Sequence, residues 1–106
     1  MKELPGHYVE LRKRFKGFMR AVDNLGKAAS ASGPLDEKTS HLIQLAAAAA
    51  MKSEGAVHSH TRRALKAGAK IEDIQHAIIL LTSTIGFPAV SAALSWIDDV
   101  MKYRKQ

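Results

Sequence analysis

The chain of 106 residues contains no cysteine. This absence excludes a disulfide scaffold, a thiolate zinc site, a cysteine nucleophile and any dithiol redox chemistry. Long apolar runs are also missing: the longest, 45–51, has seven residues, whereas a spanning helix needs roughly 20. Residues 1–7 lack the apolar core of a signal peptide. We therefore expect a cytoplasmic protein without membrane association.

The composition is otherwise that of a folded domain. Hydrophobic residues make up 46% and charged residues 25% of the chain, the ordinary balance of a soluble globular domain. The length predicts one domain over 1–106. The formal charge of +6 permits an acidic partner. Only 6% of the residues are aromatic and the chain shows no helix-turn-helix signature, so we expect no nucleic-acid binding.

Apolar residues recur at steps of three and four through most of the chain, which indicates helices. Asp36 is a candidate N-cap and Gly68 a candidate C-terminal cap residue. No segment alternates with a period of two for long, so the predicted fold is all-α. About five helices are expected: an amphipathic one over 7–30, one over 36–52, one that follows a short break near 53–55 and runs to about 67, and two more over 71–85 and 89–101. The last four lie within a core of 35–102.

Two of these helices are apolar on most sides. The helix over 36–52 contains five consecutive alanines, and the helix over 71–85 carries a wide apolar stripe. A helix of that kind is buried on most sides, yet a domain of this size buries only about 60–65% of its unfolded surface. Association with further copies of the chain would supply the missing cover, and we expect an oligomer.

Four segments are similar to a known family, in order and at the right spacings. They are 35–43 (LDEKTSHLI), 60–69 (HTRRALKAGA), 71–74 (IEDI) and 86–89 (GFPA). They resemble the LD-x-KT-x-EL, HT-x-x-AL-x-AGA, x-EEI and GFPA segments of the carboxymuconolactone decarboxylase and alkylhydroperoxidase D-like family. The resemblance implies an all-helical domain that assembles into a homotrimer or homohexamer.

The peroxidase branch of that family works through Glu-x11-Cys-x2-Cys-x3-His. Carried over to this chain, its glutamate falls at His41, its cysteines at Ser53 and Ala56, and its histidine at His60. A serine and an alanine cannot form the reversible disulfide of a peroxiredoxin-like cycle. The resemblance to the decarboxylase branch, which also lacks these cysteines, therefore implies a lyase with acid–base chemistry on a small acidic metabolite.

Three residues form the predicted catalytic site: His60, His41 and Ser53. Imidazole suits proton transfer near neutral pH, and Ser53 shares a face with His60 if one helix runs unbroken through both. Two facing imidazoles, His41 and His60, can share a proton or hold a divalent metal ion. His58, about 200° round the helix from His60, is not expected to join them.

Basic residues follow His60 directly. Arg62 and Arg63 are the predicted binding residues for a small anionic substrate. A solvated helix face is the simpler interpretation of the same basic residues. No cofactor is implied apart from the alternative of a divalent metal. A non-catalytic member of the same family, which binds a small ligand or serves as a structural oligomer, remains the second hypothesis.

Overall fold

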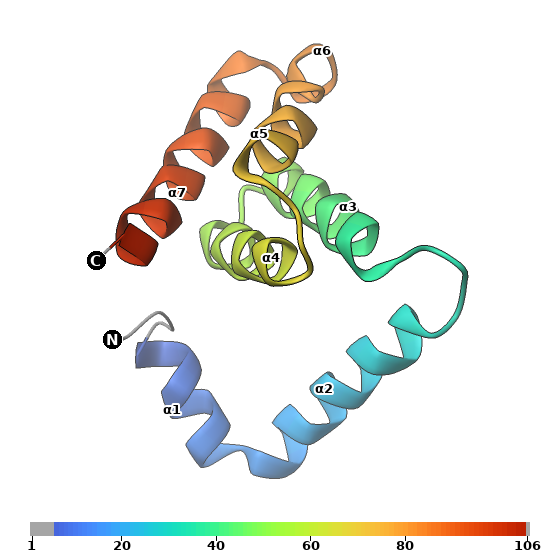
Figure 1. Ribbon diagram of the computed structural model, residues 1–106. Coiled ribbons are helices and arrows are strands. Elements are labelled where there is room, and N and C mark those ends of the chain that lie inside the picture. Colours follow the sequence, from blue (N-terminus) through green and yellow to red (C-terminus); the bar gives the residue numbers. More distant parts are fainter. Residues whose placement is uncertain (1–5, 106) are drawn as a thin grey trace. The chain divides into compact units, whose positions relative to one another are not determined.

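The computed structural model describes residues 6–105, and all regular structure in that range is helical, as predicted. Figure 1 shows the order of the elements along the chain. The helices are α1 (Gly6–Arg14), α2 (Lys16–Ser30), α3 (Glu37–Ala50), α4 (Glu54–Lys66), α5 (Ile71–Ile79), α6 (Thr82–Ile85) and α7 (Phe87–Lys105). None of the helices in the described range is long and apolar enough to cross a membrane.

The chain divides into two compact units, Met1–Leu35 and Asp36–Gln106. The second unit coincides with the predicted core of 35–102 and its C-terminal extension. Its first residue, Asp36, caps α3, and the residues that carry the family resemblance from 36 to 89 all lie within it. The candidate site therefore belongs to the second unit alone.

The first unit contains two helices where one continuous helix was expected over 7–30. The backbone leaves the helical region at Phe15, with φ −125° and ψ 63°. Arg12 on α1 donates two hydrogen bonds to the carboxylate of Asp23 on α2, at 3.0 and 2.6 Å. The apolar period continues across Phe15, so periodicity alone did not reveal this break.

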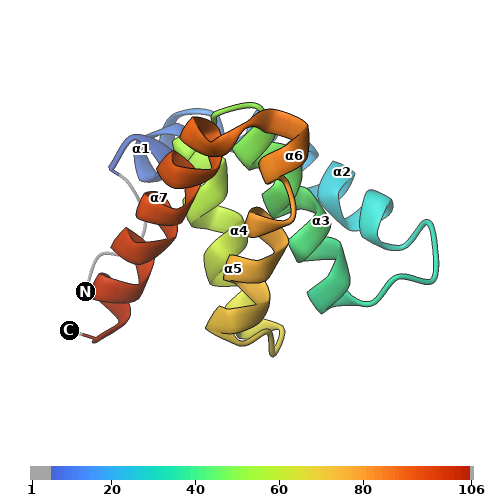
Figure 2. The same cartoon turned by 90° about the horizontal axis from the view of Figure 1, so that it is seen from above.

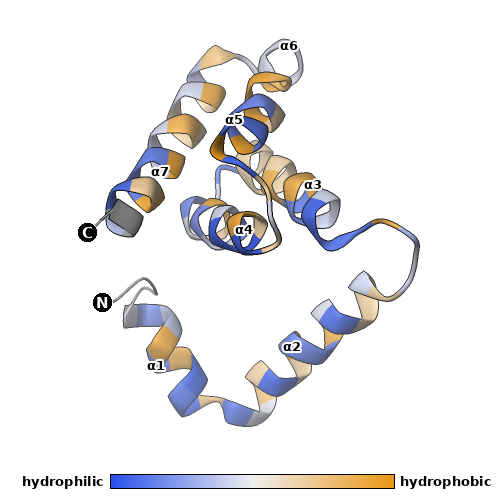
Figure 3. Ribbon diagram, in the orientation of Figure 1, coloured by the Kyte–Doolittle hydropathy of each residue, from blue (hydrophilic) through white to orange (hydrophobic). Residues whose placement is uncertain are grey.

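The second unit is built around α4, which lies between α3 and α7 in both Figure 1 and Figure 2. The apolar character of α3 over most of its length is evident in Figure 3. The core is formed by small and branched aliphatic side chains from α3, α4, α5 and α7 and from the connection between α4 and α5: Leu45, Ala48, Ala49, Val57, Ala64, Ala69, Ile74, Ile78, Val90, Ala93 and Ile97. Alanines on α3 allow its neighbours to approach closely, which places α3 and α4 in contact.

The turns before and after α4, which end α3 and α4, are of the same kind. After α3, the amides of Lys52 and Ser53 donate to the carbonyls of Ala49 and Ala48. After α4, the amides of Gly68 and Ala69 donate to the carbonyls of Leu65 and Ala64. Both are Schellman motifs, which require a left-handed residue just past the helix. After α4 this residue is Gly68, the predicted cap residue, with φ +103°. After α3 it is Lys52, with φ +58°.

The helix expected over 71–85 is shorter than predicted. Helix α5 ends at Ile79, and the short α6 follows before Gly86 turns the chain with φ +92°. The hydroxyl of Thr82 donates to the carbonyl of Ile79 at 2.7 Å, which satisfies an acceptor at the end of α5. Several large apolar side chains in this region, Ile79, Leu80 and Phe87, are exposed in the single chain.

Candidate active site

His41 and His60 lie on the two arms of a helical hairpin. His41 is in the second turn of α3, one turn before the buried Leu45. His60 is at the end of the second turn of α4, next to the buried Thr61. Because the chain reverses at 51–53, the first half of α3 meets the middle of α4. This reversal brings together two residues that are 19 positions apart in the sequence.

The two imidazoles are in direct contact, as the resemblance implied. Their Nδ1 atoms are 3.3 Å apart. The ring centroids are 5.5 Å apart and the ring planes are tilted by 37°. This separation fits one hydrogen bond between the Nδ1 atoms. It also fits two ligands of one tetrahedral ion, since nitrogens about 2.1 Å from such an ion stand about 3.4 Å apart.

Both imidazoles are held in the neutral form at pH 7. Burial lowers the pKa of His60 from 6.5 to about 4, with further lowering by the charges of Arg63 and His41. Burial also lowers the pKa of His41, Arg63 adds to this effect, and Glu37 opposes it. The physical reason is common to both: a partly buried site beside a guanidinium disfavours an additional positive charge.

In a neutral pair whose Nδ1 atoms face each other, the two Nε2 atoms, here called the outer nitrogens, differ in protonation. A neutral imidazole carries one proton, so the ring that donates Nδ1–H to its partner has an unprotonated Nε2. The ring that accepts at Nδ1 must carry its own proton on Nε2. The pair therefore offers one proton acceptor and one proton donor. If the acceptor Nε2 takes up a proton and the donor Nε2 releases one while the proton between the Nδ1 atoms shifts to the other ring, both rings stay neutral and exchange these roles.

Ser53 lies at the start of α4 and not within it. Its Oγ accepts a hydrogen bond from the backbone amide of Ala56 at 3.4 Å, and its backbone completes the turn after α3. Helix α4 begins one residue later, at Glu54, so no unbroken helix runs through 53, 56 and 60. The break expected near 53–55 lies at 51–53. This position makes Ser53 a helix-capping residue that fixes where α4, with His60, begins.

The two arginines after His60 differ in their surroundings. Arg63 is exposed, and its charge acts on both imidazoles. Arg62 is partly buried, and its charge is not among the causes of either lowered pKa. Of the two residues predicted to bind an anion, Arg63 is the one whose charge lowers the pKa of both imidazoles.

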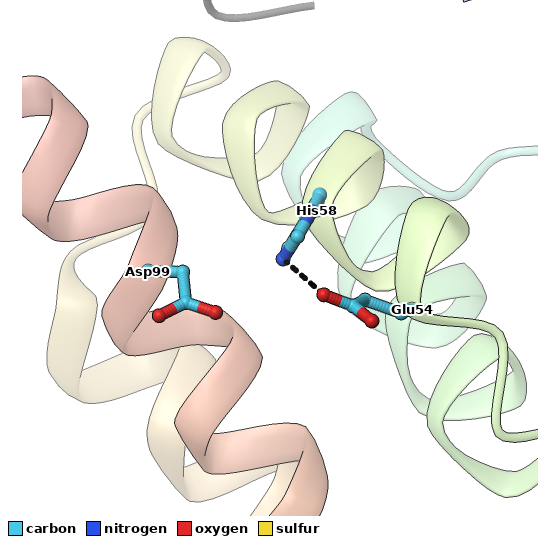
Figure 4. A group of neighbouring side chains, drawn as sticks. All are labelled: Glu54, His58 and Asp99. Carbon is cyan, nitrogen blue, oxygen red and sulfur yellow. Dashed lines mark ion pairs between the residues drawn. The ribbon is translucent and has the colours of Figure 1, made fainter. Parts of the chain in front are cut away.

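A second group of ionisable residues was missed by the sequence analysis. Glu54 and His58 on α4 and Asp99 on α7 bring one ligand atom each to within 4.8 Å of one another (Figure 4). Glu54 and His58 are four residues apart on one helix, a spacing that could have been noticed. Asp99 is 41 residues beyond His58, and only the packing of α7 against α4 brings it there.

Fold and site together define an all-helical protein with two histidines in a helical hairpin and no thiol. The model of the carboxymuconolactone decarboxylase family matches residues 16–99. An uncharacterized protein of Methanocaldococcus jannaschii is 33% identical over 98 residues, which are 92% of each chain. The chain belongs to the carboxymuconolactone decarboxylase family.

A solved structure is also similar. The crystal structure of an apo carboxymuconolactone decarboxylase family protein from Legionella pneumophila has a TM-score of 0.77 and 25% sequence identity to this chain. The match covers 92% of this chain and 87% of that one. The family resemblance drawn from four short segments is thus confirmed.

Proposed function

We propose that the chain catalyses proton transfer on a small acidic metabolite, as a decarboxylase-like lyase and not as a dithiol peroxidase. The observation that supports the proposal is the contact of 3.3 Å between the Nδ1 atoms of His41 and His60. One imidazole removes a proton from the substrate while the other donates one, because their outer nitrogens are in opposite protonation states. The lack of any cysteine excludes the peroxidase cycle for this chain.

Arg63 supplies the affinity for an acid. A guanidinium pairs with a carboxylate through two parallel hydrogen bonds, and the charge of this one acts on both imidazoles. A bound carboxylate would neutralise the charge of Arg63. Since that charge lowers the pKa of both histidines, substrate binding raises their pKa toward neutrality, where an imidazole is most effective as a base.

Ser53 acts in this proposal as a positioning residue. Its hydroxyl oxygen already accepts a bond from the amide of Ala56, which makes it a poor nucleophile or proton relay. By capping α4 it determines the axial position of His60 against His41. We therefore assign the reacting groups to His41 and His60 and the anion contact to Arg63.

Solvent exchange tests the proposal directly. The full chain, freed of metal, is incubated in D₂O with a panel of small keto and lactone acids, and NMR follows deuterium uptake and decarboxylation. His60→Gln should lower the rate by about 10²- to 10⁴-fold, the usual contribution of a general acid or base. Arg63→Met should raise KM for acids more than it lowers kcat.

Matched controls separate these effects from loss of charge or fold. His76→Gln changes an exposed histidine on α5, and Lys66→Met removes an exposed cation from α4 itself. Neither should change the rate. Tight binding of an acid without exchange or turnover would contradict the enzyme and favour the non-catalytic ligand-binding hypothesis. Equal rates in the His60→Gln and His76→Gln variants would contradict the assigned base.

A further inference from the structure

Glu54, His58 and Asp99 converge from two helices that pack against each other. Figure 4 shows Glu54 and His58 projecting from α4 toward Asp99 on α7. The Nε2 atom of His58 lies 3.7 Å from a carboxylate oxygen of Glu54, and the three ligand atoms lie within 4.8 Å of one another. Two ligands at i and i+4 on one helix, completed by a third from another helix, form a common basis for metal sites.

The imidazole of His58 points to a bound ion, because one of its nitrogens lacks a partner. Its Nε2 atom is buried and has no hydrogen-bond partner among the described residues. Buried polar atoms almost always have a partner, because desolvation without one is costly. The distance of 3.7 Å to Glu54 is too long for a hydrogen bond but close to the separation of about 3.4 Å between two ligands of a tetrahedral ion.

The charges and donor atoms define the kind of ligand. The two carboxylates supply a charge of −2, within a chain of formal charge +6, and an imidazole binds a metal ion in its neutral form. One nitrogen and two oxygens without sulfur suit a divalent transition-metal ion such as Zn²⁺, whereas Mg²⁺ and Ca²⁺ prefer oxygen alone. Glu54 is exposed and therefore free to close the remaining distance at little energetic cost.

From this convergence we infer that Glu54, His58 and Asp99 form a binding site for a divalent transition-metal ion that joins the start of α4 to α7. Water would complete the coordination. The site is separate from the histidine pair, because His58 and His60 lie two residues apart and project from nearly opposite sides of α4. It does not depend on the proposed function.

Zinc binding by the metal-stripped full chain tests the inference. Isothermal titration with ZnCl₂ should give one ion per chain, and Zn²⁺ should raise the thermal unfolding midpoint because it binds the folded state. Loss of a residue that only orients a ligand weakens metal binding by about 10- to 100-fold. Glu54→Gln, His58→Gln and Asp99→Asn should therefore each weaken it by at least about tenfold.

Two controls match these variants closely. Asp98→Asn changes the neighbouring, exposed carboxylate on α7, and His76→Gln changes an exposed histidine on α5. Both should bind Zn²⁺ as the unchanged chain does, and circular dichroism should confirm that all variants fold. Binding lost in His41→Gln or His60→Gln but kept in His58→Gln would place the ion at the imidazole pair. That outcome, or no binding at all, would overturn the inference.

Discussion

At the scale of single residues, the neutrality of His41 and His60 is the property on which the proposed chemistry depends. Both side chains are partly buried, and the charge of Arg63 lowers the pKa of both. In the glutamate position of the peroxidase branch, an acid would hold the facing imidazole as a cation. A second imidazole there does the opposite, because two close positive charges repel each other.

The two histidines should titrate as a coupled pair. In NMR titrations of the metal-free chain, the midpoint of His60 should lie at about 4 and that of His41 below 6.5. His41→Gln should raise the pKa of His60, because the charge of His41 is one cause of its lowering. Arg63→Met should raise both values. Independent titration of both rings near 6.5 would contradict a coupled site.

The same shifts predict how stability depends on pH. The unfolded chain takes up protons on these imidazoles at about 6.5, whereas folded His60 does so at about 4. The unfolded state therefore binds more protons between these values, and the free energy of unfolding falls as the pH drops from about 6.5 to 4. Urea denaturation across this range should show the decrease, and the decrease should be smaller in His60→Gln. If the free energy of unfolding fell equally with pH in this variant, groups other than His60 would cause the decrease.

At the scale of elements, the α3–α4 hairpin determines the site. The same turn that ends α3 also caps α4, since Ser53 takes part in both. The contact between His41 and His60 depends on how many residues separate each histidine from this turn. If α4 began one residue earlier or later relative to His60, the side chain of His60 would be rotated by about 100° away from His41.

Ser53→Ala should therefore weaken the hairpin. Loss of an N-cap hydroxyl costs about 1 kcal/mol, and we expect a decrease of that size in the free energy of unfolding by urea. Ser91→Ala changes an exposed serine within α7 and should have little effect. A decrease of equal size in both variants would contradict the capping role of Ser53.

Gly68→Ala should be destabilising for a different reason. Gly68 has φ +103°, a backbone conformation that costs an L-residue about 1–2 kcal/mol. Gly26→Ala is the matched control, because Gly26 lies within α2 with open space around it. That change should stabilise the chain by about 0.5–1 kcal/mol. Thermal and urea unfolding of both variants measure the difference, and equal effects would contradict strain at Gly68.

At the scale of the whole molecule, apolar side chains remain exposed on several helices of the single chain. On α2, Phe18, Val22 and Leu25 follow one another at helical spacing and are 63%, 43% and 70% exposed. In the second unit, Leu80 and Phe87 are 63% and 65% exposed. Exposed large apolar side chains at helical spacing are typical of a surface that another protein covers.

We propose that further copies of the chain cover these surfaces, in a trimer or hexamer. Light scattering at micromolar concentration should give a mass of at least three subunits. Phe18→Glu should lower that mass, whereas Lys16→Glu, at an exposed polar position of the same helix, should not. A monomer at all concentrations would contradict this prediction.

The sequence by itself determined the helical fold, the cap residues Asp36 and Gly68, and the family. These features depend on local periodicity, on capping chemistry and on short motifs, all of which act within a few residues. It also predicted that His41 and His60 face each other, though through the family's motif and not through local physics. Asp36 accepts the amide of Thr39 at 2.8 Å, as a capping residue should.

Only the tertiary structure decided the details of contact. It broke the expected helix of 7–30 at Phe15, ended α5 at Ile79, and distinguished Arg63 from Arg62. It also brought Asp99 to His58 through the packing of α7 against α4. The physical reason is that helix breaks and long-range contacts follow from how whole faces pack, which no local pattern of residues encodes.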